Sequence, residues 1–268
     1  MEKAEPHIVV QDLTVAYGRN VILHDLTFTI NRGDIFIIMG GSGGGKSTVL
    51  RSMVGLLQPT RGQVLYEGLS FWSAGPEEQK SIMRKFGILY QSGALWSSLT
   101  LAENVALPLQ QYTDLSPGQI KKIVLLKLAL VGLAGFEEYY PSEISGGMKK
   151  RAGLARAMAL DPDILFFDEP SAGLDPISAH LLDELILELR DSLRATVVVV
   201  THELASIFAI GNNSVFLDAD TKTVTAAGDP RTLLTESRDP KVINFLTRGA
   251  GVVDKRQQPA SLDRGARP

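Results

Sequence analysis

A glycine-rich segment that ends in a lysine and a serine constrains this chain more than any other feature. It fits the pattern G-x-x-x-x-G-K-[ST]. The apolar run Ile35–Met39 before it predicts a buried strand, and a helical pattern begins at Ser47. An ordinary glycine-rich turn is the alternative, but it does not explain Gly-Lys-Ser between strand and helix. The segment therefore predicts a nucleoside triphosphate site made of Gly40, Gly41, Ser42, Gly43, Gly44, Gly45, Lys46, Ser47 and Thr48.

The residue types in this loop suit phosphate chemistry. Glycines allow backbone conformations with positive φ and let successive N–H groups approach phosphate oxygens closely. Lys46 is placed to reach the β- and γ-phosphates, and the Ser47 hydroxyl is placed to ligate Mg²⁺. The N-terminus of the following helix adds the positive end of its dipole. We therefore expect ATP or GTP with Mg²⁺.

Composition limits the other possibilities. The 268 residues suffice for a substantial core, and the net charge of −3 gives no strong field for nucleic acid. The absence of cysteine excludes disulfides and thiolate metal sites. The polar N-terminus shows no signal-peptide core, and the apolar stretch Ile123–Phe136 is short and interrupted by Lys127. These features predict a cytoplasmic protein without a membrane span.

The order of patterns along the chain predicts an α/β fold. Alternating apolar residues in the first thirty positions predict an antiparallel β subdomain. Helix signals replace strand signals over about 92–160, where Ser116 and Pro117 predict a helix start. Continuous apolar runs at Ile164–Phe167 and Thr196–Val200 then predict buried parallel strands in a mixed, mainly parallel sheet.

Boundaries and smaller features complete this prediction. We expect one domain over 7–248, with a helical subdomain at approximately 92–160, and a disordered tail over 249–268 that is rich in Arg, Gln, Pro and Gly. An edge hairpin is predicted around Asp218–Lys222. In the helical region, we expect an apolar face made of Leu125, Leu126, Leu128, Ala129 and Leu133.

Two adjacent carboxylates follow the strand Ile164–Phe167. Asp168 and Glu169 would stand at its carboxyl end, where α/β sheets place their ligands. Asp168 suits support of Mg²⁺, and Glu169 suits polarising an attacking water. A simple helix cap is the alternative when this pair is taken alone.

A second anion-binding pattern lies 23 residues before Asp168. Ser145 would cap a helix that runs to Leu160, and Gly146 and Gly147 would expose its amide donors. A glycine-capped helix without a ligand is the alternative for this motif alone.

Together these motifs resemble the ABC ATPases, a family of P-loop NTPases, from about Ile8 to Leu234. The resemblance implies that Ser145, Gly146 and Gly147 form the signature that covers the γ-phosphate held by the partner's loop in a head-to-tail homodimer. It implies further roles for three residues and one loop: adenine stacking for Tyr17, contact with Mg²⁺ and the attacking water for Gln91, γ-phosphate contact for His202, and a place at the dimer interface for the loop Ser171–Asp175. The implied set is then Glu169, His202 and Gln91 for catalysis, with Ser47, Gln91 and Asp168 around the metal.

Two departures from the family pattern stand out. Gly41 replaces a frequent proline, so we expect a more mobile loop, and Met148 replaces a frequent glutamine. This methionine, together with the segment Gln91–Thr100 and the C-terminal stretch Asp239–Leu246, resembles the ATPase of MCE-type lipid transporters, which include the system that maintains outer-membrane lipid asymmetry.

The closer resemblance implies partners and a location. It implies an integral membrane permease dimer that is received by the segment after Gln91, a periplasmic MCE-domain protein, a small STAS-type regulatory subunit, and a place at the cytoplasmic face of the inner membrane. Trp96 would be an anchor for the permease or, alternatively, a core residue of the helical region.

Other functions fit the chain less well. The ATPase of another import-type ABC transporter is the nearest alternative. A soluble ABC ATPase acting on ribosomes or DNA usually has two cassettes or a coiled-coil insertion, and the acidic balance also argues against a nucleic-acid face. A P-loop kinase of small molecules leaves Ser145-Gly146-Gly147 unexplained.

Overall fold

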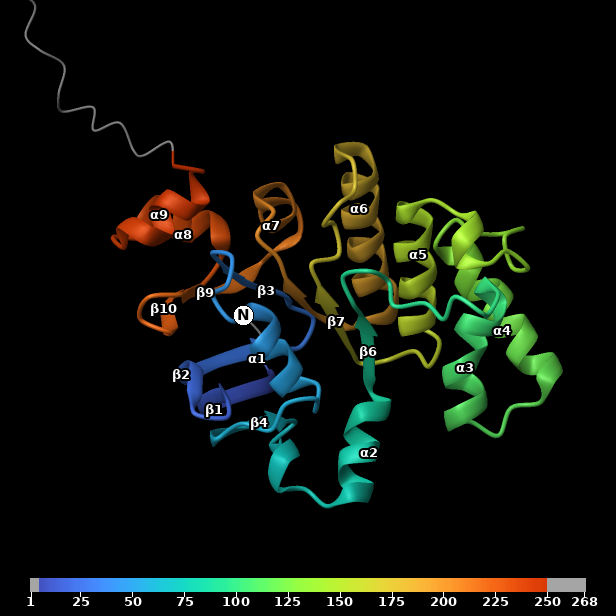
Figure 1. Cartoon of the computed structure of the whole chain (residues 1–268), viewed down its shortest axis with the longest axis horizontal. Helices are drawn as coiled ribbons and strands as arrows, with labels where there is room; N and C mark the ends of the chain where they lie inside the picture. The colour runs from blue at the N-terminus through green and yellow to red at the C-terminus, as the bar shows by residue number, and fades with distance from the viewer. Residues whose placement is uncertain (1–4, 250–268) are drawn as a thin grey trace, which may run out of the picture.

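A computed structural model describes residues 5–249 of the chain, in which two sheets and a group of helices share one body (Figure 1). The strands are β1 (Pro6–Tyr17), β2 (Asn20–Asn31), β3 (Ile35–Gly40), β4 (Arg61–Tyr66), β5 (Leu69–Ser70), β6 (Phe86–Leu89), β7 (Ile164–Asp168), β8 (Thr196–Val200), β9 (Asn213–Asp218) and β10 (Thr223–Ala227). The predicted tail, 249–268, lies outside the described residues except for Gly249.

The helices connect and cover these strands. They are α1 (Lys46–Met53), α2 (Pro76–Arg84), α3 (Leu101–Tyr112), α4 (Pro117–Leu130), α5 (Gly146–Ala157), α6 (Pro176–Leu193), α7 (Leu204–Ile210), α8 (Pro230–Glu236) and α9 (Pro240–Leu246). Short 3₁₀ turns stand at Phe71–Ser73 and Pro141–Glu143. Several predicted ends shift by a few residues, so that α5 ends at Ala157 instead of Leu160.

The larger sheet has the order β10-β9-β3-β8-β7-β6. Strands β6, β7, β8, β3 and β9 pair in parallel, and β10 closes one edge as an antiparallel hairpin with β9. Strands β3 and β8 are buried along their whole length. Burial on both faces explains their continuous apolar sequences. The predicted fold class and its edge hairpin are confirmed.

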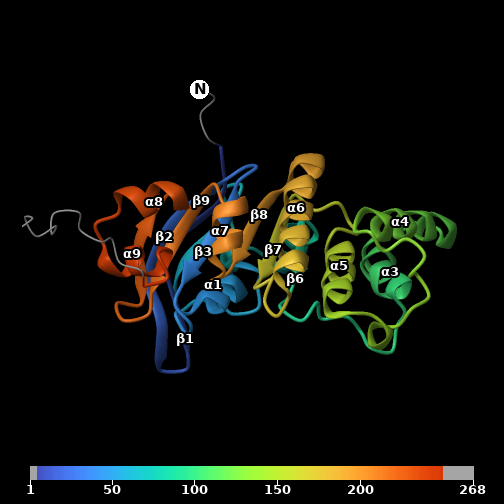
Figure 2. The ribbon, with the colours of Figure 1, turned by 90° about the horizontal axis from the view of Figure 1, so that it is seen from above.

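A second, antiparallel sheet has the order β2-β1-β4-β5. Alternate residues of the parallel strands divide the core into two layers. Phe36, Ile38 and Val198 face the antiparallel sheet and α1, whereas Ile37 and Val199 face the helices on the opposite side. Figure 2 shows this arrangement from above, with α1 on one side of the sheet and α6 and α7 on the other.

Helices α3, α4 and α5 lie together beyond the β6 edge of the sheet in both views (Figures 1 and 2). The predicted apolar face of α4 is partly wrong. Leu128 is buried, but Leu125 and Leu126 are exposed, and the other buried positions are Ile120, Val124 and Lys127. These positions keep a helical period, and the buried Lys127 forms an ion pair with Asp161.

Candidate active site

A pocket of 480 Å³ lies where β3, β7 and β8 end, at the start of α1. The ends of parallel strands are the place where α/β sheets bind ligands. Residues from five separate segments line this pocket: Ile22, Ser42, Gly43, Gly44, Gly45, Lys46, Ser47, Thr48, Gln91, Glu169 and His202. The structure therefore brings most of the predicted nucleotide and catalytic residues together.

Two glycines of the loop between β3 and α1 are required by its shape. Gly40 has φ +149°, and a Cβ atom there would lie 2.4 Å from the Leu217 carbonyl oxygen. Gly45 has φ +82°, and its Cβ would lie 2.6 Å from Leu23 Cδ1. A side chain at either position would push the loop away from β9 or β2. Gly41, by contrast, has open space around it.

Lys46 is held inside the loop that it follows. Its Nζ donates to the carbonyl oxygens of Gly40 at 3.1 Å and Gly41 at 3.0 Å, and only 7% of the residue is exposed. Burial lowers the pKa of this ammonium, while the nearby carboxylates of Glu169 and Asp168 act in the opposite direction. The cation thus stands where phosphate oxygens can replace the two carbonyls as acceptors.

Ser47 and Asp168 form the oxygen pair expected beside a magnesium ion. Ser47 Oγ donates to Asp168 Oδ1 at 2.9 Å. Burial raises the pKa of Asp168, and the hydrogen bond from Ser47 partly offsets this shift. Asp168 does not line the pocket itself but stands behind Ser47.

Glu169 and His202 form a hydrogen-bonded pair at the pocket wall. His202 Nδ1 lies 2.8 Å from Glu169 Oε1. Because an ionised carboxylate only accepts, Nδ1 is the donor and carries a proton. The other oxygen, Glu169 Oε2, is buried and has no hydrogen-bond partner within residues 5–249. Glu169 has φ +50°, which is uncommon for a residue with a side chain and turns the chain away at the end of β7.

Tyr17 stands apart from the pocket lining. It is 47% exposed at the end of β1, and Arg51 Nη1 of α1 donates to its hydroxyl at 3.1 Å. Sequence reasoning missed Arg51 and also Ile22, which lines the pocket. Ile22 follows the hairpin turn after Tyr17, and this proximity was the available signal.

The signature residues do not line the pocket of their own chain. Ser145 caps α5, where its Oγ accepts from Met148 N at 3.2 Å, and Gly146 and Gly147 begin the helix. Asp175 caps α6 by accepting from Ile177 N and Ser178 N. Ser145 and Gly146 are exposed, so the amide donors of this helix start face outward.

Comparison with known proteins decides the family. The sequence profile described as ABC transporter matches residues 23–172, which include the phosphate loop, the signature and Asp168-Glu169. The chain belongs to the ABC transporter ATPase family.

Two relatives and one solved structure illustrate this ABC membership. The chain is 42% identical to the probable ribonucleotide transport ATP-binding protein mkl of Mycobacterium tuberculosis over 89% of its own length, but it spans only 66% of that protein. It is 41% identical to MlaF of Haemophilus influenzae, described as the ATP-binding protein of an intermembrane phospholipid transport system, over 89% of both chains. A dimeric bacterial ABC transporter cassette, MJ0796, is 30% identical with a TM-score of 0.75, over 83% of this chain and 98% of that one.

Within 5–249, no helix has the length and apolar character needed to cross a bilayer. The same part of the chain contains no group of three or more His, Cys, Asp or Glu side chains placed to hold a metal by themselves.

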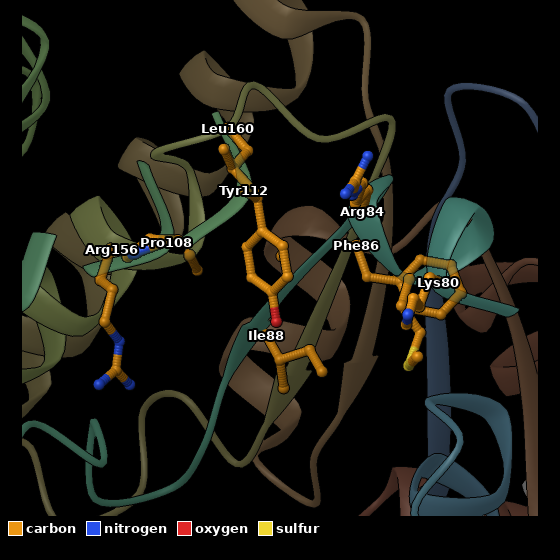
Figure 3. Close-up of a pocket in the computed structure, with 11 residues that line it drawn as sticks. Lys80, Arg84, Phe86, Ile88, Pro108, Tyr112, Arg156 and Leu160 are labelled. Atoms are coloured by element: carbon orange, nitrogen blue, oxygen red, sulfur yellow. The ribbon is translucent and has the colours of Figure 1, made fainter. Parts of the chain in front are cut away.

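A separate pocket of 280 Å³ lies between the core of this ABC chain and its helical region. Figure 3 shows the Tyr112 ring near its middle, with the hydroxyl toward Ile88 and with Arg84 and Arg156 on opposite sides. The Arg84 guanidinium carbon lies 5.9 Å from the Tyr112 ring centroid. Lys80 also lines the pocket, and no Asp or Glu does.

Proposed function

We propose that this chain binds ATP with Mg²⁺ and hydrolyses it as a homodimer, and that hydrolysis drives a membrane permease that moves phospholipid. One observation carries the proposal: Lys46, the Ser47–Asp168 pair and the Glu169–His202 pair converge on a single pocket. The function that MlaF is named for supports phospholipid as the cargo.

Nucleotide binding is assigned to the loop and to Tyr17. Backbone N–H groups of 43–48 and the Lys46 ammonium would hold the phosphates, while the Tyr17 ring, oriented by Arg51, would stack on adenine. Ser47 and Asp168 would hold Mg²⁺, together with Gln91, which lines the same pocket. The ion would neutralise negative charge on the phosphates.

Hydrolysis is assigned to Glu169 and His202. Glu169 Oε1 is engaged by His202, and the buried Oε2 has no partner among the described residues, so Oε2 would accept the proton of an attacking water that reaches it. His202 thereby fixes the carboxylate, and its Nε2, which lies 3.7 Å from Glu203 Oε1, would contact the γ-phosphate. Gln91, which also lines the pocket, would help to orient the water.

The signature completes the site in trans. Ser145 and the glycines after it lie outside the lining of their own pocket, so they would cover the nucleotide of a second copy. MJ0796, whose structure is described as dimeric, supports this arrangement. Asp175 and the loop before it would lie along the same interface.

The permease is proposed to dock at the pocket between α2, α3 and α5 and at the loop before α3. Arg156 connects the pocket to the loop, because its side chain lines the pocket and donates to the carbonyl oxygens of Gly93 and Ala94 in the loop. Trp96 in this loop is 62% exposed, which excludes the alternative that it packs in the core. An apolar segment with an acidic residue would complement Lys80, Arg84 and Arg156. The protein would then act at the cytoplasmic face of the inner membrane, beneath a periplasmic MCE-domain protein, with a STAS-type subunit as a further partner.

Membrane recruitment tests the proposal. The chain is expected to sediment with membranes only when its permease is co-expressed, and Trp96→Ala should weaken this association by about 2–4 kcal/mol while leaving the thermal midpoint unchanged. Leu69→Ala, which truncates an exposed apolar side chain on β5, is the matched control.

Two further readouts of this experiment separate the alternatives. Co-purification with ribosomes or DNA in place of membranes would contradict a transport role. Mass spectrometry of the intact complex should find phospholipid. Ribonucleotide bound outside the ATP site would instead favour ribonucleotide as the cargo, as in the name of mkl.

A further inference from the structure

Helix α5 carries a buried lysine whose role the proposed ATPase site leaves unexplained. Lys150 is 6% exposed and stands five residues after Ser145. Its Nζ donates to the Pro170 carbonyl oxygen at 2.6 Å and also to the Ala172 carbonyl oxygen. A buried ammonium is costly unless it is hydrogen-bonded, so these two carbonyls determine where the side chain rests.

The two carbonyls belong to the turn that directly follows Glu169. This turn is fixed at its start, because Glu169 N donates to the Val200 carbonyl at 2.8 Å, and Ala172 N donates back to the Glu169 carbonyl at 3.2 Å. Glu169 itself has φ +50°. Lys150 ties this turn to α5. Its pKa is lowered by burial and raised in part by the nearby charge of Glu169.

Helix α5 also holds the segment after Gln91. Arg156 Nη2 donates to the Gly93 carbonyl at 3.0 Å, and a Cβ atom on Gly153 would lie 2.9 Å from the same oxygen. In both views α5 lies between the β6–β7 side of the parallel sheet and helices α3 and α4 (Figures 1 and 2). One rigid helix therefore joins the signature at its N-terminus, the Glu169 turn in its middle and the Gln91 segment near its C-terminal end.

We propose that Lys150 is a positioning residue, which sets the turn after Glu169 relative to the signature helix so that the carboxylate meets the attacking water only when α5 is in place. This inference rests on the proposed function. It means that a shift of α5, caused by a partner copy at Ser145 or by a permease at the pocket of Arg156, reaches Glu169 through the Lys150 hydrogen bonds. Removal of the ammonium should thus affect turnover far more than nucleotide binding.

The test compares Lys150→Met, Lys150→Arg and Lys127→Met in the full chain. Methionine keeps most of the stem but leaves both carbonyls without their donor, whereas arginine keeps a charged donor. Lys127 is the matched control, because it is equally buried and pairs with Asp161 away from the Glu169 turn. ATP hydrolysis, the Kd of a fluorescent ATP analogue for the isolated chain, and the thermal midpoint are measured for each.

We expect Lys150→Met to lower kcat by about 10- to 100-fold, as small misplacements of catalytic groups do, with the Kd for nucleotide within about twofold of the parent. Lys150→Arg should retain most of the parental kcat. Lys127→Met should lower the thermal midpoint but leave kcat close to that of the parent.

Three results overturn the inference. The first is parental kcat in folded Lys150→Met, the second is equal loss of kcat in Lys127→Met, and the third is a loss confined to nucleotide affinity. Absence of hydrolysis in the parent would instead contradict the proposed function, so the two failures are distinguishable.

Discussion

Glu169 is the single residue on which the proposed chemistry depends, because it is the one carboxylate among the described residues that line the pocket. Glu169→Gln keeps the shape and the contact with His202 but removes the general base. We expect ATP binding to persist and hydrolysis to fall by roughly 10²–10⁴-fold. Single-turnover hydrolysis with radiolabelled ATP measures the rate, and Glu77→Gln, an exposed carboxylate on α2, is the control. Parental turnover by the glutamine variant would remove Glu169 from this role.

At the residue scale, the sequence was most informative where chemistry and spacing coincide. Lys46, Ser47, Glu169 and His202 each follow a predicted strand or begin a predicted helix, so their convergence at one edge of the sheet could be foreseen. The contact from Arg51 to Tyr17 could not, because it joins a helix to a strand of the other sheet. The role of Lys150 could not be foreseen either, because its partners lie 20 and 22 residues further along the chain.

At the element scale, the hairpin of β9 and β10 supports the phosphate loop from behind. The Leu217 carbonyl lies against Gly40, and the next residue, Asp218, is bound by Lys241 of α9 at 2.8 Å. Lys241 and the hydroxyl of Thr221 lower the pKa of Asp218 from 3.8 to about 2. The last helix of the described chain is therefore connected to the back of the nucleotide site through one carboxylate.

This pKa shift predicts how stability depends on pH. A carboxyl whose pKa is lower in the folded state stabilises the fold fully above its unfolded value of 3.8, and the contribution is lost as the pH falls toward about 2. Asp218→Asn should therefore lower the free energy of unfolding by a constant amount above about pH 5, and by a shrinking amount in more acidic solution. Urea unfolding at several pH values measures this. Asp220→Asn is the control, since Asp220 pairs with the same lysine but is 81% exposed. A difference that stays constant down to about pH 3 would contradict the shift.

Helix α4 shows why some elements resist prediction from sequence. Its run Leu125-Leu126-Lys127-Leu128 is apolar on several sides, so the local pattern does not identify the buried face. The burial of Lys127 is compensated by Asp161, which lies 34 residues away. A long-range ion pair therefore placed a charge in the core and left two leucines outside. Strands β3 and β8 posed no such difficulty, because both faces are covered and every position is apolar or small.

At the scale of the whole molecule, the two halves of the proposed site lie on different parts of one chain. The phosphate loop and Glu169 share a pocket, whereas the signature at the start of α5 is exposed and outside it. The proposed head-to-tail dimer with two-fold symmetry would bring each signature to the other copy's nucleotide and close the interface. The isolated chain should accordingly bind nucleotide but hydrolyse it only after two copies meet.

Mixing two inactive variants tests this geometry. Ser145→Arg damages the signature, and Lys46→Ala damages the phosphate loop, so each homodimer has two damaged sites. A heterodimer has one site that combines both lesions and one that is intact. When equal amounts of the two variants are mixed, about half of the dimers are heterodimers, and each has one intact site. About one quarter of all sites are then intact, so we expect recovery of about one quarter of parental hydrolysis.

The mixture would stay inactive if hydrolysis requires two intact sites in the same dimer. Crosslinking between the two copies then tests whether the site is shared. The chain has no cysteine, so a cysteine introduced at Ser145 can meet only one introduced at Ser42 of the phosphate loop. The two substitutions are placed on separate chains that also carry Glu169→Gln, because nucleotide trapped by this variant should keep the dimer closed. An oxidant is then added with and without ATP. An ATP-dependent disulfide between the chains places signature and phosphate loop on opposite sides of one nucleotide. Absence of both the disulfide and the recovered activity would show that each chain works alone.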